Sequence, residues 1–495
     1  MTSAKPMKLN ELLQDVIDVA GVDVYVSGLQ LDSRKVVKGD LFVALSGTRE
    51  QGHEYVAAAI EAGAVAVLVD ESVAGDMGDV AVPCLAVSEL KQKLGLIAER
   101  FYGFASRQMF VIGVTGTNGK TSCSHFIAQV LNSETVPVAV IGTLGYGPVE
   151  NLQSAAHTTP DAISLHRMMR EFVDAGIKCL VMEVSSHGLD QGRVAGVSFD
   201  LALFTNLTRD HLDYHADMEA YGQAKARLFE MPGLRYAVIN ADDEFGRSLL
   251  LNLPAAVETL AFTQAENHIE ENVVRGELIS QGRDGLLLDV QTPWGDGRIH
   301  SDLLGQFNAS NLLAVLSTVL LSGMGMDKAL QKISQLKAVA GRVERFGGMA
   351  NQPLVVVDYA HTPDALEQVL VSLRQHCAAQ LWCVFGCGGE RDKGKRAQMG
   401  SIATQYADHV VLTDDNPRNE NPGAIIEDIR AGAQSGRVTV LRDRAEAIRH
   451  AVAHAVADDV ILVAGKGHED FQQLGGQKIP FSDAEQVRQA LGVAA

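Results

Sequence analysis

Three zones of hydrophobic patterning follow one another along the chain, and they predict three α/β domains. Residues 1–108 begin with helix-like spacing over Leu9–Val19 and continue with short strand-like runs such as Leu41–Leu45. Residues 109–340 carry longer, more regular apolar runs, and residues 341–495 alternate strands with helices. We therefore expect domains at 1–108, 109–340 and 341–495, with a linker at the end of the first zone.

The middle zone has the pattern of a buried, mainly parallel sheet. The runs Cys179–Val184 and Leu201–Thr205 are apolar throughout, which is typical of strands covered on both faces. Apolar positions in Ile163–Val173 recur on one helix face. Between 260 and 300 the runs are shorter and more polar, which indicates a peripheral β region, and Asn311–Leu321 then predicts a closing helix.

The last zone predicts a Rossmann-like, doubly wound domain. Its apolar runs alternate with helical patterns such as the one formed by Leu366, Val369, Leu370 and Leu373. The expected strands are Leu354–Val357, Leu381–Phe385, His409–Leu412, Val438–Leu441 and Asp459–Val463. The predicted fold class is thus α/β: a small N-terminal α/β domain, a central domain with a mainly parallel sheet, and a Rossmann-like C-terminal domain.

Composition excludes several classes of protein. The 495 residues carry 42 Lys and Arg against 61 Asp and Glu, a net charge of −19, so any anionic ligand needs dedicated cationic pockets and no nucleic-acid partner is expected. Six scattered cysteines do not suggest a disulfide scaffold. The chain contains no run of 18 apolar residues, so we expect no membrane span. Met1–Val16 lacks the apolar core of a signal peptide. We expect a cytoplasmic location.

The strongest local signal is a phosphate-binding loop. Val114–Thr121 reads Val-Thr-Gly-Thr-Asn-Gly-Lys-Thr, with a predicted strand before it and a predicted helix after it. Backbone N–H groups at such a helix start cradle phosphates, Lys120 reaches the β and γ oxygens, and the Thr121 hydroxyl binds Mg²⁺. The match departs from the usual pattern at Val114, where the first glycine belongs.

A phosphate loop alone leaves three classes open. These are an ATP-driven ligase or kinase, a regulatory GTPase or motor, and a non-catalytic nucleotide-binding scaffold. We find no guanine-reading Asn-Lys-x-Asp after a strand, which disfavours a GTPase. Leu180–Glu183 is an apolar run ending in an acid, and Glu183 is therefore placed where a Mg²⁺ ligand sits.

A second polar cluster follows a predicted strand. In Thr205–His215, His211 and His215 have a spacing that could bind zinc, but no third ligand is evident. Hard-cation chemistry involving His211 and Glu183 beside the phosphate loop is the better interpretation. Further on, the spacing in Tyr221–Phe229 predicts only an amphipathic helix that bears Lys225.

Taken together, the ordered motifs along the whole chain resemble the Mur ligase family of ATP-dependent amide-bond-forming enzymes. They are Gly113–Thr121, Glu183–Gly188, Asn206–His211, Tyr221–Phe229, Gly305–Asn311, Gly341–Glu344 and Asp358–His361. Gly386–Arg396, Asp415–Arg418 and Ala464–Glu469 resemble the member of that family that adds meso-diaminopimelate to UDP-N-acetylmuramoyl-L-alanyl-D-glutamate in peptidoglycan synthesis.

The resemblance implies a fold, a reaction and partners. The first domain would hold the UDP end of the substrate, the second would be the ATPase, and the third would supply the amino acid. The substrate γ-carboxylate would attack the γ-phosphate of ATP, and the incoming amine would displace phosphate from the acyl phosphate. The implied partners are the UDP-linked dipeptide and meso-diaminopimelate, with ATP and Mg²⁺ as cofactors and a monomeric enzyme.

The resemblance also assigns site residues around ATP and the metal. The catalytic group would be Lys120, Glu183, His211 and Lys225. Thr121 and Glu183 would hold one Mg²⁺, while Glu183, His211 and Lys225, carbamylated by CO₂ into a hard oxygen ligand, would hold a second. The implied ATP contacts are Gly116, Thr117, Asn118, Gly119, Lys120, Thr121, Ser122, Asn308, Arg342 and Asp358.

The remaining implied residues read the two other substrates. The UDP-linked dipeptide would contact Leu31, Ser33, Thr48, Arg49, Glu50, His157, Thr158, Thr159, Ser185, Gln191 and Arg193. Diaminopimelate would contact Arg391, Asp415, Asn416, Pro417, Arg418, Gly465 and Glu469. The guanidinium of Arg418 would match the distal carboxylate that distinguishes diaminopimelate from lysine.

Plainer alternatives accompany these assignments. Arg418 could be a loop arginine paired with Glu420, Lys466 could be a loop residue, and Thr158 and Thr159 could cap the helix beginning near Asp161. At the level of the whole protein, relatives that add lysine, another amino acid or a dipeptide, and a scaffold with a decayed site, remain open. Arg418 argues against lysine, and the intact metal and phosphate ligands argue against the scaffold.

Overall fold

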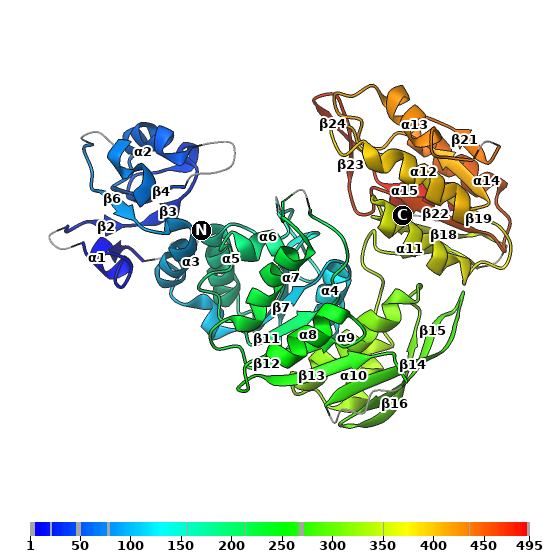
Figure 1. Cartoon of the computed structure of the whole chain (residues 1–495), viewed down its shortest axis with the longest axis horizontal. Coiled ribbons are helices and arrows are strands. Elements are labelled where there is room, and N and C mark those ends of the chain that lie inside the picture. Colours follow the sequence, from blue (N-terminus) through cyan, green and yellow to red (C-terminus); the bar gives the residue numbers. More distant parts are fainter. Residues whose placement is uncertain are drawn as a thin grey trace. The chain divides into compact units, whose positions relative to one another are not determined.

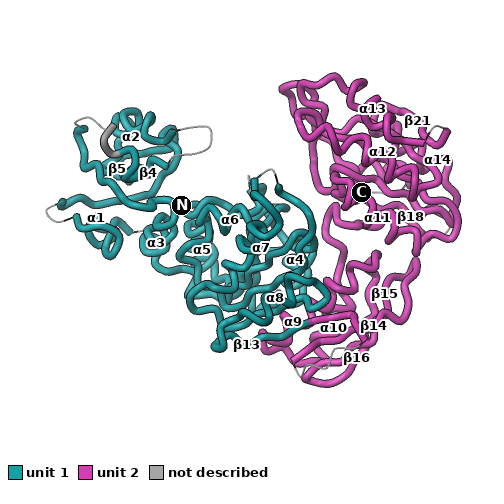
Figure 2. The backbone as a smooth tube through the Cα atoms, viewed as in Figure 1, with its two compact units in different colours: residues 1–261 teal, residues 262–495 magenta. Residues whose placement is uncertain are grey.

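A computed structural model describes residues 5–19, 22–45, 51–76, 80–155, 157–212, 214–266, 272–349, 351–434 and 436–492. It divides into two compact units, residues 1–261 and residues 262–495 (Figure 2). The two units are described separately. The predicted domain boundaries, after residues 108 and 340, are not tested by this division and stay predictions.

Unit 1 begins with a small parallel sheet. Its four strands follow one another in the order β3 (Gly28–Gln30), β4 (Asp40–Ala44), β5 (Ala66–Asp70) and β6 (Cys84–Val87). The helices of this region are α1 (Leu9–Leu12), α2 (Val56–Ala62) and α3 (Leu90–Phe101), and a separate antiparallel pair joins β1 (Met7–Lys8) to β2 (Tyr25–Val26). Leucines and valines from α1, α3 and the sheet form its core.

One expectation for this region was too long. The predicted helix over Leu9–Val19 ends after Leu12, because Asp15 takes a left-handed conformation with φ of 62° that an α-helix cannot continue through. Helix α2 and strand β5 are separated by Gly63, which has φ of 112°. Glycine tolerates that angle and ends the helix.

A second, larger sheet in unit 1 carries the phosphate loop. Strand β7 (Phe110–Thr115) is central, with β11 (Leu201–Phe204) on one side and β10 (Cys179–Glu183) on the other, all parallel (Figure 1). Within unit 1 the sheet continues through β12 (Tyr236–Asn240) to the first residues of β13 (Glu258–Thr263) on one side, and through β8 (Val138–Gly142) and antiparallel β9 (Gly145–Pro148) on the other.

Helices accompany this sheet, and apolar residues of all but the first of them contribute to one buried core with its strands. They are α4 (Lys120–Leu131), α5 (Ala162–Asp174), α6 (Ser186–Asp190), α7 (Met218–Ala226) and α8 (Glu244–Asn252). Because β7, β10 and β11 run in parallel, their carboxyl ends lie at the same edge of the sheet. Thr115, Glu183 and Phe204 end these three strands, so the polar loops that follow them meet at this edge.

Unit 2 contains an antiparallel meander and a second doubly wound sheet. The meander is formed by β14 (Val273–Gly282), β15 (Gly285–Thr292) and β16 (Gly295–Ser301), followed by α9 (Phe307–Leu321) and α10 (Met326–Ile333). The sheet has the order β17-β18-β22-β19-β20-β21 and is parallel except for β17. Its strands are β17 (Glu344–Gly347), β18 (Leu354–Asp358), β19 (Leu381–Phe385), β20 (His409–Leu412), β21 (Val438–Val440) and β22 (Val460–Ala464).

The helices around the second sheet are α11 (Pro363–Arg374), α12 (Gly394–Tyr406), α13 (Pro422–Arg430), α14 (Arg444–His454) and α15 (Asp483–Leu491). A hairpin, β23 (Phe471–Leu474) and β24 (Gln477–Pro480), follows the last strand of the sheet. The expected α/β fold with a mainly parallel central sheet and a Rossmann-like C-terminal domain is confirmed. Across the described ranges, no helix combines the length and apolar character needed to cross a bilayer.

Candidate functional site

The phosphate loop lies between β7 and α4 as the sequence predicts. Gly116 and Gly119 have φ of 147° and 84°, conformations that side chains with a Cβ rarely adopt. A Cβ on Gly116 would also lie 1.9 Å from Thr205 Oγ1, so this position has no space for one. Thr121 and Ser122 lie in the first turn of α4, where free backbone N–H groups point out of the helix start.

The loop after β11 fixes the conformation of the phosphate loop. The Asn206 backbone carbonyl accepts from Thr117 N at 2.8 Å, and its side-chain oxygen accepts from Asn118 N at 2.9 Å. The Thr205 hydroxyl donates to the Asn118 carbonyl at 2.6 Å. Two loops distant in sequence therefore form one rigid structure, which is the preorganisation that a phosphate site requires.

Glu183 is buried at the end of β10 and is held by three donors. Thr143 N lies 2.8 Å from Oε1, while the hydroxyls of Thr121 and Thr143 each lie 3.0 Å from Oε2. The side chain is 0 % exposed, so these donors offset the cost of burying its charge. The structure thus brings the two predicted ligands of the first Mg²⁺, Thr121 and Glu183, into direct contact.

Two lysines converge on the carbonyl of Gly116. Lys120 Nζ and Lys225 Nζ each lie 2.8 Å from that oxygen, and Lys120 also donates to the Thr117 carbonyl at 2.8 Å. Lys225 is 1 % exposed and its Nζ lies 4.3 Å from the centre of the Tyr221 ring. Burial and the neighbouring Lys120 ammonium hold the pKa of Lys225 well below its ordinary value. The spacing of Tyr221–Phe229 alone gives no sign that Lys225 is buried.

His211 lies near this group through aromatic contacts. Its ring centre is 6.0 Å from that of Tyr221 and 4.8 Å from that of His187. His215 is buried, and one of its ring nitrogens lies 3.0 Å from Ser186 Oγ. No three His, Cys, Asp or Glu side chains of the described residues form a group that could hold a metal. The zinc alternative for His211 and His215 therefore gains no support.

The residues predicted to contact the dipeptide end of the substrate form a network beside Glu183. The Thr159 hydroxyl donates to the Glu183 carbonyl at 3.1 Å and accepts from Ser185 N at 3.0 Å. Arg193 donates to the Thr159 carbonyl at 2.8 Å and to Gln191 Oε1 at 2.7 Å.

The flanking threonine and histidine lie at the start of this network. Thr158 Oγ1 is 3.1 Å from Thr143 Oγ1, and His157 is exposed. The cap of α5 is Asp161, whose carboxylate accepts from Ser164 N at 2.9 Å, so neither Thr158 nor Thr159 supplies that cap.

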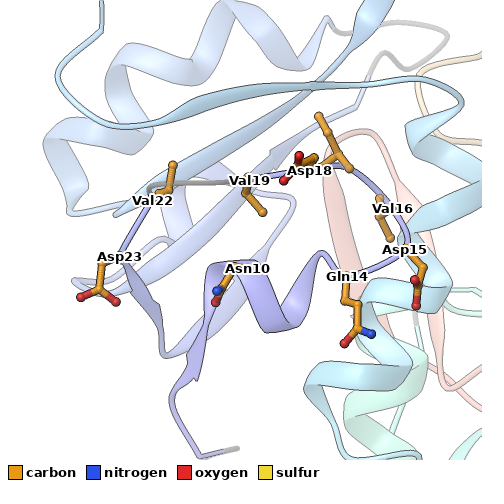
Figure 3. Close-up of a pocket in the computed structure, with 9 residues that line it drawn as sticks. Asn10, Gln14, Asp15, Val16, Asp18, Val19, Val22 and Asp23 are labelled. Carbon is orange, nitrogen blue, oxygen red and sulfur yellow. The ribbon is translucent and has the colours of Figure 1, made fainter.

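The predicted uridine region is only partly described. Leu31 and Ser33 are half-buried after β3, and Ser33 begins a short 3₁₀ turn. Thr48, Arg49 and Glu50 lie outside the described residues. A cavity of about 690 Å³ does open in this part of the chain (Figure 3), but its lining comes from the segments around α1 and includes none of these predicted residues.

Three candidate ATP residues belong to unit 2. Asn308 is buried at the start of α9, where it donates to the Leu304 carbonyl at 2.7 Å and accepts from Asn311 Nδ2 at 2.8 Å. Asp358 accepts from Val343 N at 2.9 Å and Ala360 N at 2.7 Å, and burial raises its pKa. The Arg342 guanidinium lies 4.7 Å from the Tyr359 ring centre.

The loop Asp415–Arg418 is built against the hairpin β23–β24. Gln472 Nε2 donates to the carbonyls of Asp414 and Asp415 at 3.2 and 2.8 Å. Arg418 N donates to the Gln473 carbonyl at 3.1 Å, and Gly475 N donates to the Arg418 carbonyl at 2.7 Å. Asn416 accepts from Gln473 N at 2.8 Å. The hairpin therefore holds the predicted specificity loop along its length.

Arg418 itself does not form the ion pair that the plainer alternative required. Glu420 instead pairs with Arg396 and with Lys393, the latter at 3.3 Å. Arg418 has φ of 53° and donates through Nη1 to the Gly389 carbonyl at 2.6 Å. Its side chain is half-buried, so the guanidinium is held at a defined place on the rim of the loop.

The other predicted diaminopimelate residues gather around this loop. A Cβ on Gly388 would lie 3.1 Å from Arg418 Nη1 and 3.8 Å from Arg391 Cγ, which places both arginines beside one glycine. A Cβ on Gly465 would lie 2.8 Å from Asp415 Oδ2. Glu469 accepts from Asn416 Nδ2 at 2.8 Å, and Pro417 is buried between these groups. Two cations and two acids thus line one region of unit 2.

Sequence reasoning missed three residues of these sites. Thr143 supplies two of the three donors to Glu183, and Gln472 fixes the specificity loop, but neither belongs to a motif we singled out. Lys466 was an unassigned loop residue, yet it is 0 % exposed and lies 2.9 Å from Glu469. The position of Thr143, directly after a strand of the same parallel sheet, was the one available signal.

Comparisons with known proteins agree with this geometry. Three family descriptions match the chain: the Mur ligase middle domain at residues 114–319, the Mur ligase glutamate ligase domain at 341–467, and the Mur ligase family catalytic domain at 25–102. Each matched range falls within one of the three predicted domains.

Individual relatives are similar over nearly the whole chain. The chain is 48 % identical over 488 residues to a UDP-N-acetylmuramoyl-L-alanyl-D-glutamate–2,6-diaminopimelate ligase of Pseudomonas aeruginosa, covering 98 % of each chain. It is 45 % identical over 487 residues to the enzyme of that name from Coxiella burnetii, covering 98 % of this chain and 99 % of the relative. A solved structure with the same name superposes with a TM-score of 0.74 at 36 % identity, over 98 % of this chain and 99 % of the other. With these matches, the phosphate loop and the three-domain α/β architecture, the chain belongs to the Mur ligase family.

Proposed function

We propose that this protein is an ATP-dependent ligase that adds meso-2,6-diaminopimelate to UDP-N-acetylmuramoyl-L-alanyl-D-glutamate, a step of peptidoglycan synthesis. The observation that carries the proposal is the loop Asp415–Arg418, held rigid by a hairpin beside Arg391 and Glu469. Relatives that carry this activity in their names are 45–48 % identical over almost the full chain, which supports the same assignment.

The phosphate loop would bind the triphosphate of ATP. The backbone N–H groups at the start of α4 would face the phosphates, and Lys120 would exchange its carbonyl partners for phosphate oxygens. Lys120, together with bound Mg²⁺, would counter the repulsion between the substrate carboxylate and the triphosphate. Asn308, Arg342 and Asp358 are proposed contacts to the same nucleotide.

The chemistry of Thr121 and Glu183 fits Mg²⁺. A hydroxyl and a carboxylate 3.0 Å apart at a helix start are hard oxygen donors, which this ion prefers together with phosphate oxygens. Bound Mg²⁺ would neutralise the phosphates and position them. Glu183, His211 and carbamylated Lys225 are the proposed ligands of a second ion.

We further propose that Lys225 is carbamylated. Reaction with CO₂ requires a neutral amine, and burial beside Lys120 favours the neutral form of Lys225. The amine nitrogen attacks the carbon of CO₂ and loses a proton, which leaves an anionic carbamate. That change gives the site a carboxylate-like oxygen donor in place of a cation.

Ligation would then proceed by two transfers. The γ-carboxylate of the bound dipeptide attacks the γ-phosphorus of ATP and releases ADP, which leaves an acyl phosphate. The α-amine of diaminopimelate attacks the acyl carbon, and phosphate leaves from the tetrahedral intermediate. His157, Thr158, Thr159, Ser185, Gln191 and Arg193 are proposed to orient the dipeptide, with the uridine end at Leu31, Ser33 and Thr48–Glu50.

Recognition of the amino acid would rest on opposite charges at its distal end. Arg418 and Arg391 would bind carboxylates of diaminopimelate, and Glu469 would bind the distal ammonium. L-Lysine has that ammonium but lacks the distal carboxylate, so it would leave Arg418 without its ligand. Asp415, Asn416, Pro417 and Gly465 shape the loop around these groups.

The test is ligation itself. Wild type and Arg418→Ala are incubated with ATP, Mg²⁺ and the UDP-linked dipeptide, with either meso-diaminopimelate or L-lysine, and phosphate release and product mass are measured. Arg430→Ala, an exposed arginine on α13, is the matched control. We expect ligation of diaminopimelate by wild type and by the control, and its loss in Arg418→Ala. Ligation of lysine by wild type would overturn the specificity, and no ligation with either would overturn the reaction.

The carbamate has its own test. Protein equilibrated with carbon-13 bicarbonate should give a carbamate signal in carbon-13 NMR that is absent from Lys225→Arg. A wild-type spectrum without that signal, in an enzyme active under the same conditions, would exclude a carbamate at Lys225.

Location and assembly complete the proposal. We propose that the enzyme acts in the cytoplasm, as a monomer, through domains at 1–108, 109–340 and 341–495 that hold the UDP sugar, ATP and the amino acid respectively. Light scattering of the purified protein across its working concentration range tests the monomer, and a mass near 106 kDa, about twice the chain mass of 53.0 kDa, would contradict it.

A further inference from the structure

Lys466 is a buried cation inside the region proposed to bind the amino acid. It is 0 % exposed, its Nζ lies 2.9 Å from Glu469 Oε2, and it lies 3.2 Å from Asn416 Oδ1. Asn416 Nδ2 closes the triangle by donating to the same Glu469 oxygen at 2.8 Å. Three residues of two separate loops thus form one closed polar network.

This network fixes one oxygen of Glu469 and makes no contact with the other. In the described part of the chain, the contacts of the carboxylate with Lys466 and Asn416 both fall on Oε2. The Glu469 side chain keeps 23 % exposure. An ammonium that arrives from solvent would therefore meet Oε1 of a carboxylate that is already oriented, so little freedom is lost on binding.

The backbone of the loop is fixed as well. A Cβ on Gly341 would lie 2.1 Å from His468 N, and one on Gly465 would lie 2.8 Å from Asp415 Oδ2. The loop Gly465–Glu469 is therefore packed tightly against its neighbours on two sides, and Lys466 cannot swing out to solvent without opening that packing.

The charge of Lys466 has a second consequence. It already neutralises part of the Glu469 charge, so an ammonium alone gains less there than it would beside a free carboxylate. A ligand whose distal end also carries a carboxylate for Arg418 recovers that loss, whereas L-lysine does not. Lys466 thus makes binding of the amino acid depend more strongly on its distal carboxylate.

We propose that Lys466 is a positioning residue that sets specificity: it orients Glu469 and partly neutralises it, so that the pocket selects a distal end bearing both an ammonium and a carboxylate. This inference rests on the proposed ligase function. It assigns no contact between Lys466 and the substrate.

The experiment compares Lys466→Met with wild type in ligation assays with meso-diaminopimelate and L-lysine. The KM for diaminopimelate should rise about 10- to 100-fold, because an oriented charged partner is lost. The ratio of kcat/KM for diaminopimelate over lysine should fall at least about tenfold, while the KM for ATP stays within twofold. Lys478→Met is the matched control: Lys478 is exposed and its Nζ lies 4.1 Å from the ring centre of Phe471, the ring that Lys466 also approaches at 5.6 Å.

A merely structural role would give a different result. If Lys466 acts through Glu469, Lys466→Met should add little, less than about twofold, in a Glu469→Gln background. An equal effect in both backgrounds, or an unchanged KM for diaminopimelate, would overturn the proposal. Should Lys466→Met not fold, as judged by its circular dichroism, Lys466→Gln takes its place with the same expectations. A wild type that ligates neither amino acid overturns the ligase function and, with it, the role of Lys466. An active wild type whose kinetics are unchanged in Lys466→Met overturns only the role of Lys466.

Discussion

A buried carboxylate such as that of Glu183 is stable only because its surroundings supply donors in place of water. Thr143 and Thr121 provide three of them at 2.8–3.0 Å. These groups hold the carboxylate at the edge of the sheet next to the phosphate loop, where it is a proposed ligand of Mg²⁺. The site is therefore sensitive to a small steric change at its base.

Gly142→Ala is such a change. A Cβ at this position would lie 2.2 Å from Glu183 Oε1, so the carboxylate must move. We expect a loss of at least about tenfold in kcat and a weaker dependence on Mg²⁺, measured by phosphate release in a Mg²⁺ titration. Gly325→Ala, with no heavy atom within 4 Å of its added Cβ, serves as the control. Wild-type kinetics in Gly142→Ala would show that the position of Glu183 is not critical.

The buried side chain of His166 should make the stability of unit 1 depend on pH. Its ring nitrogen Nε2 lies 2.9 Å from the Ala195 carbonyl, and burial lowers its pKa from 6.5 to about 4. Between pH 6.5 and 4, His166 binds a proton in the unfolded chain but not in the folded one. The contribution of His166 to the free energy of unfolding is therefore fully present above pH 6.5 and is lost as the pH is lowered toward 4. The contribution is about 3 kcal/mol at most.

Calorimetry across this pH range checks the prediction. His166→Gln keeps a donor for Ala195 but does not titrate, so its unfolding temperature should fall less between pH 6.5 and 4 than that of wild type. The exposed His454→Gln should behave as wild type does. Equal pH profiles for His166→Gln and wild type would rule out this residue as the source.

At the scale of elements, the hairpin β23–β24 determines the shape of the specificity loop. It pairs with Arg418 through backbone bonds and with Asp414 and Asp415 through Gln472. A two-stranded hairpin is marginally stable alone, so these bonds order both partners. The geometry of the amino-acid site therefore depends on an element that follows the last strand of the sheet.

Gln472→Leu removes two of these bonds while keeping a side chain of similar size. We expect the ratio of kcat/KM for diaminopimelate over lysine to fall about tenfold, since two carbonyls lose their donor and the loop loosens. Gln477→Leu on the exposed strand β24 is the matched control. If both variants keep the wild-type ratio, the hairpin does not position the loop.

Elements whose patterns were continuous could be predicted from sequence, and contacts between loops could not. The strands β10, β18, β19 and β20 lie close to their expected bounds, and β7 and α4 flank the phosphate loop as expected, because apolar runs and a glycine-rich turn are local signals. The helix expected over Leu9–Val19 fails because its apolar spacing continues past the left-handed Asp15. The partners of the Glu183 carboxylate and of Arg418 lie 29 or more residues away in the sequence, a separation that no local pattern reports.

At the scale of the larger units, polar contacts within unit 2 join the segment before residue 341 to the C-terminal sheet. His376, buried after α11, accepts from Gly305 N at 3.1 Å through Nε2, and its Nδ1 lies 2.7 Å from the Gly282 carbonyl. Arg283 donates to the Asp459 carbonyl at 3.2 Å and pairs with Asp458 at 3.3 Å. One neutral histidine thus ties a β-turn to the loop that precedes Asn308.

His376→Leu should loosen this connection. The backbone N–H of Gly305 and the carbonyl of Gly282 lose their partner, so we expect faster hydrogen exchange over residues 303–308 and a rise in the KM for ATP of about threefold or more. Hydrogen exchange with mass spectrometry provides the measurement, and the exposed His409→Leu is the control. Unchanged exchange at 303–308 would contradict the connection.

The φ of 53° at Arg418 places the proposed specificity residue where the backbone favours asparagine or glycine. Such a conformation costs a bulky residue about 1 kcal/mol, a cost that the hydrogen bonds to the hairpin must offset. If Arg418 reads the amino acid as proposed, the chain gives up stability at the point where it gains selectivity. Selection for thermostability alone would favour replacing this arginine, and only demand for the correct amino acid would retain it.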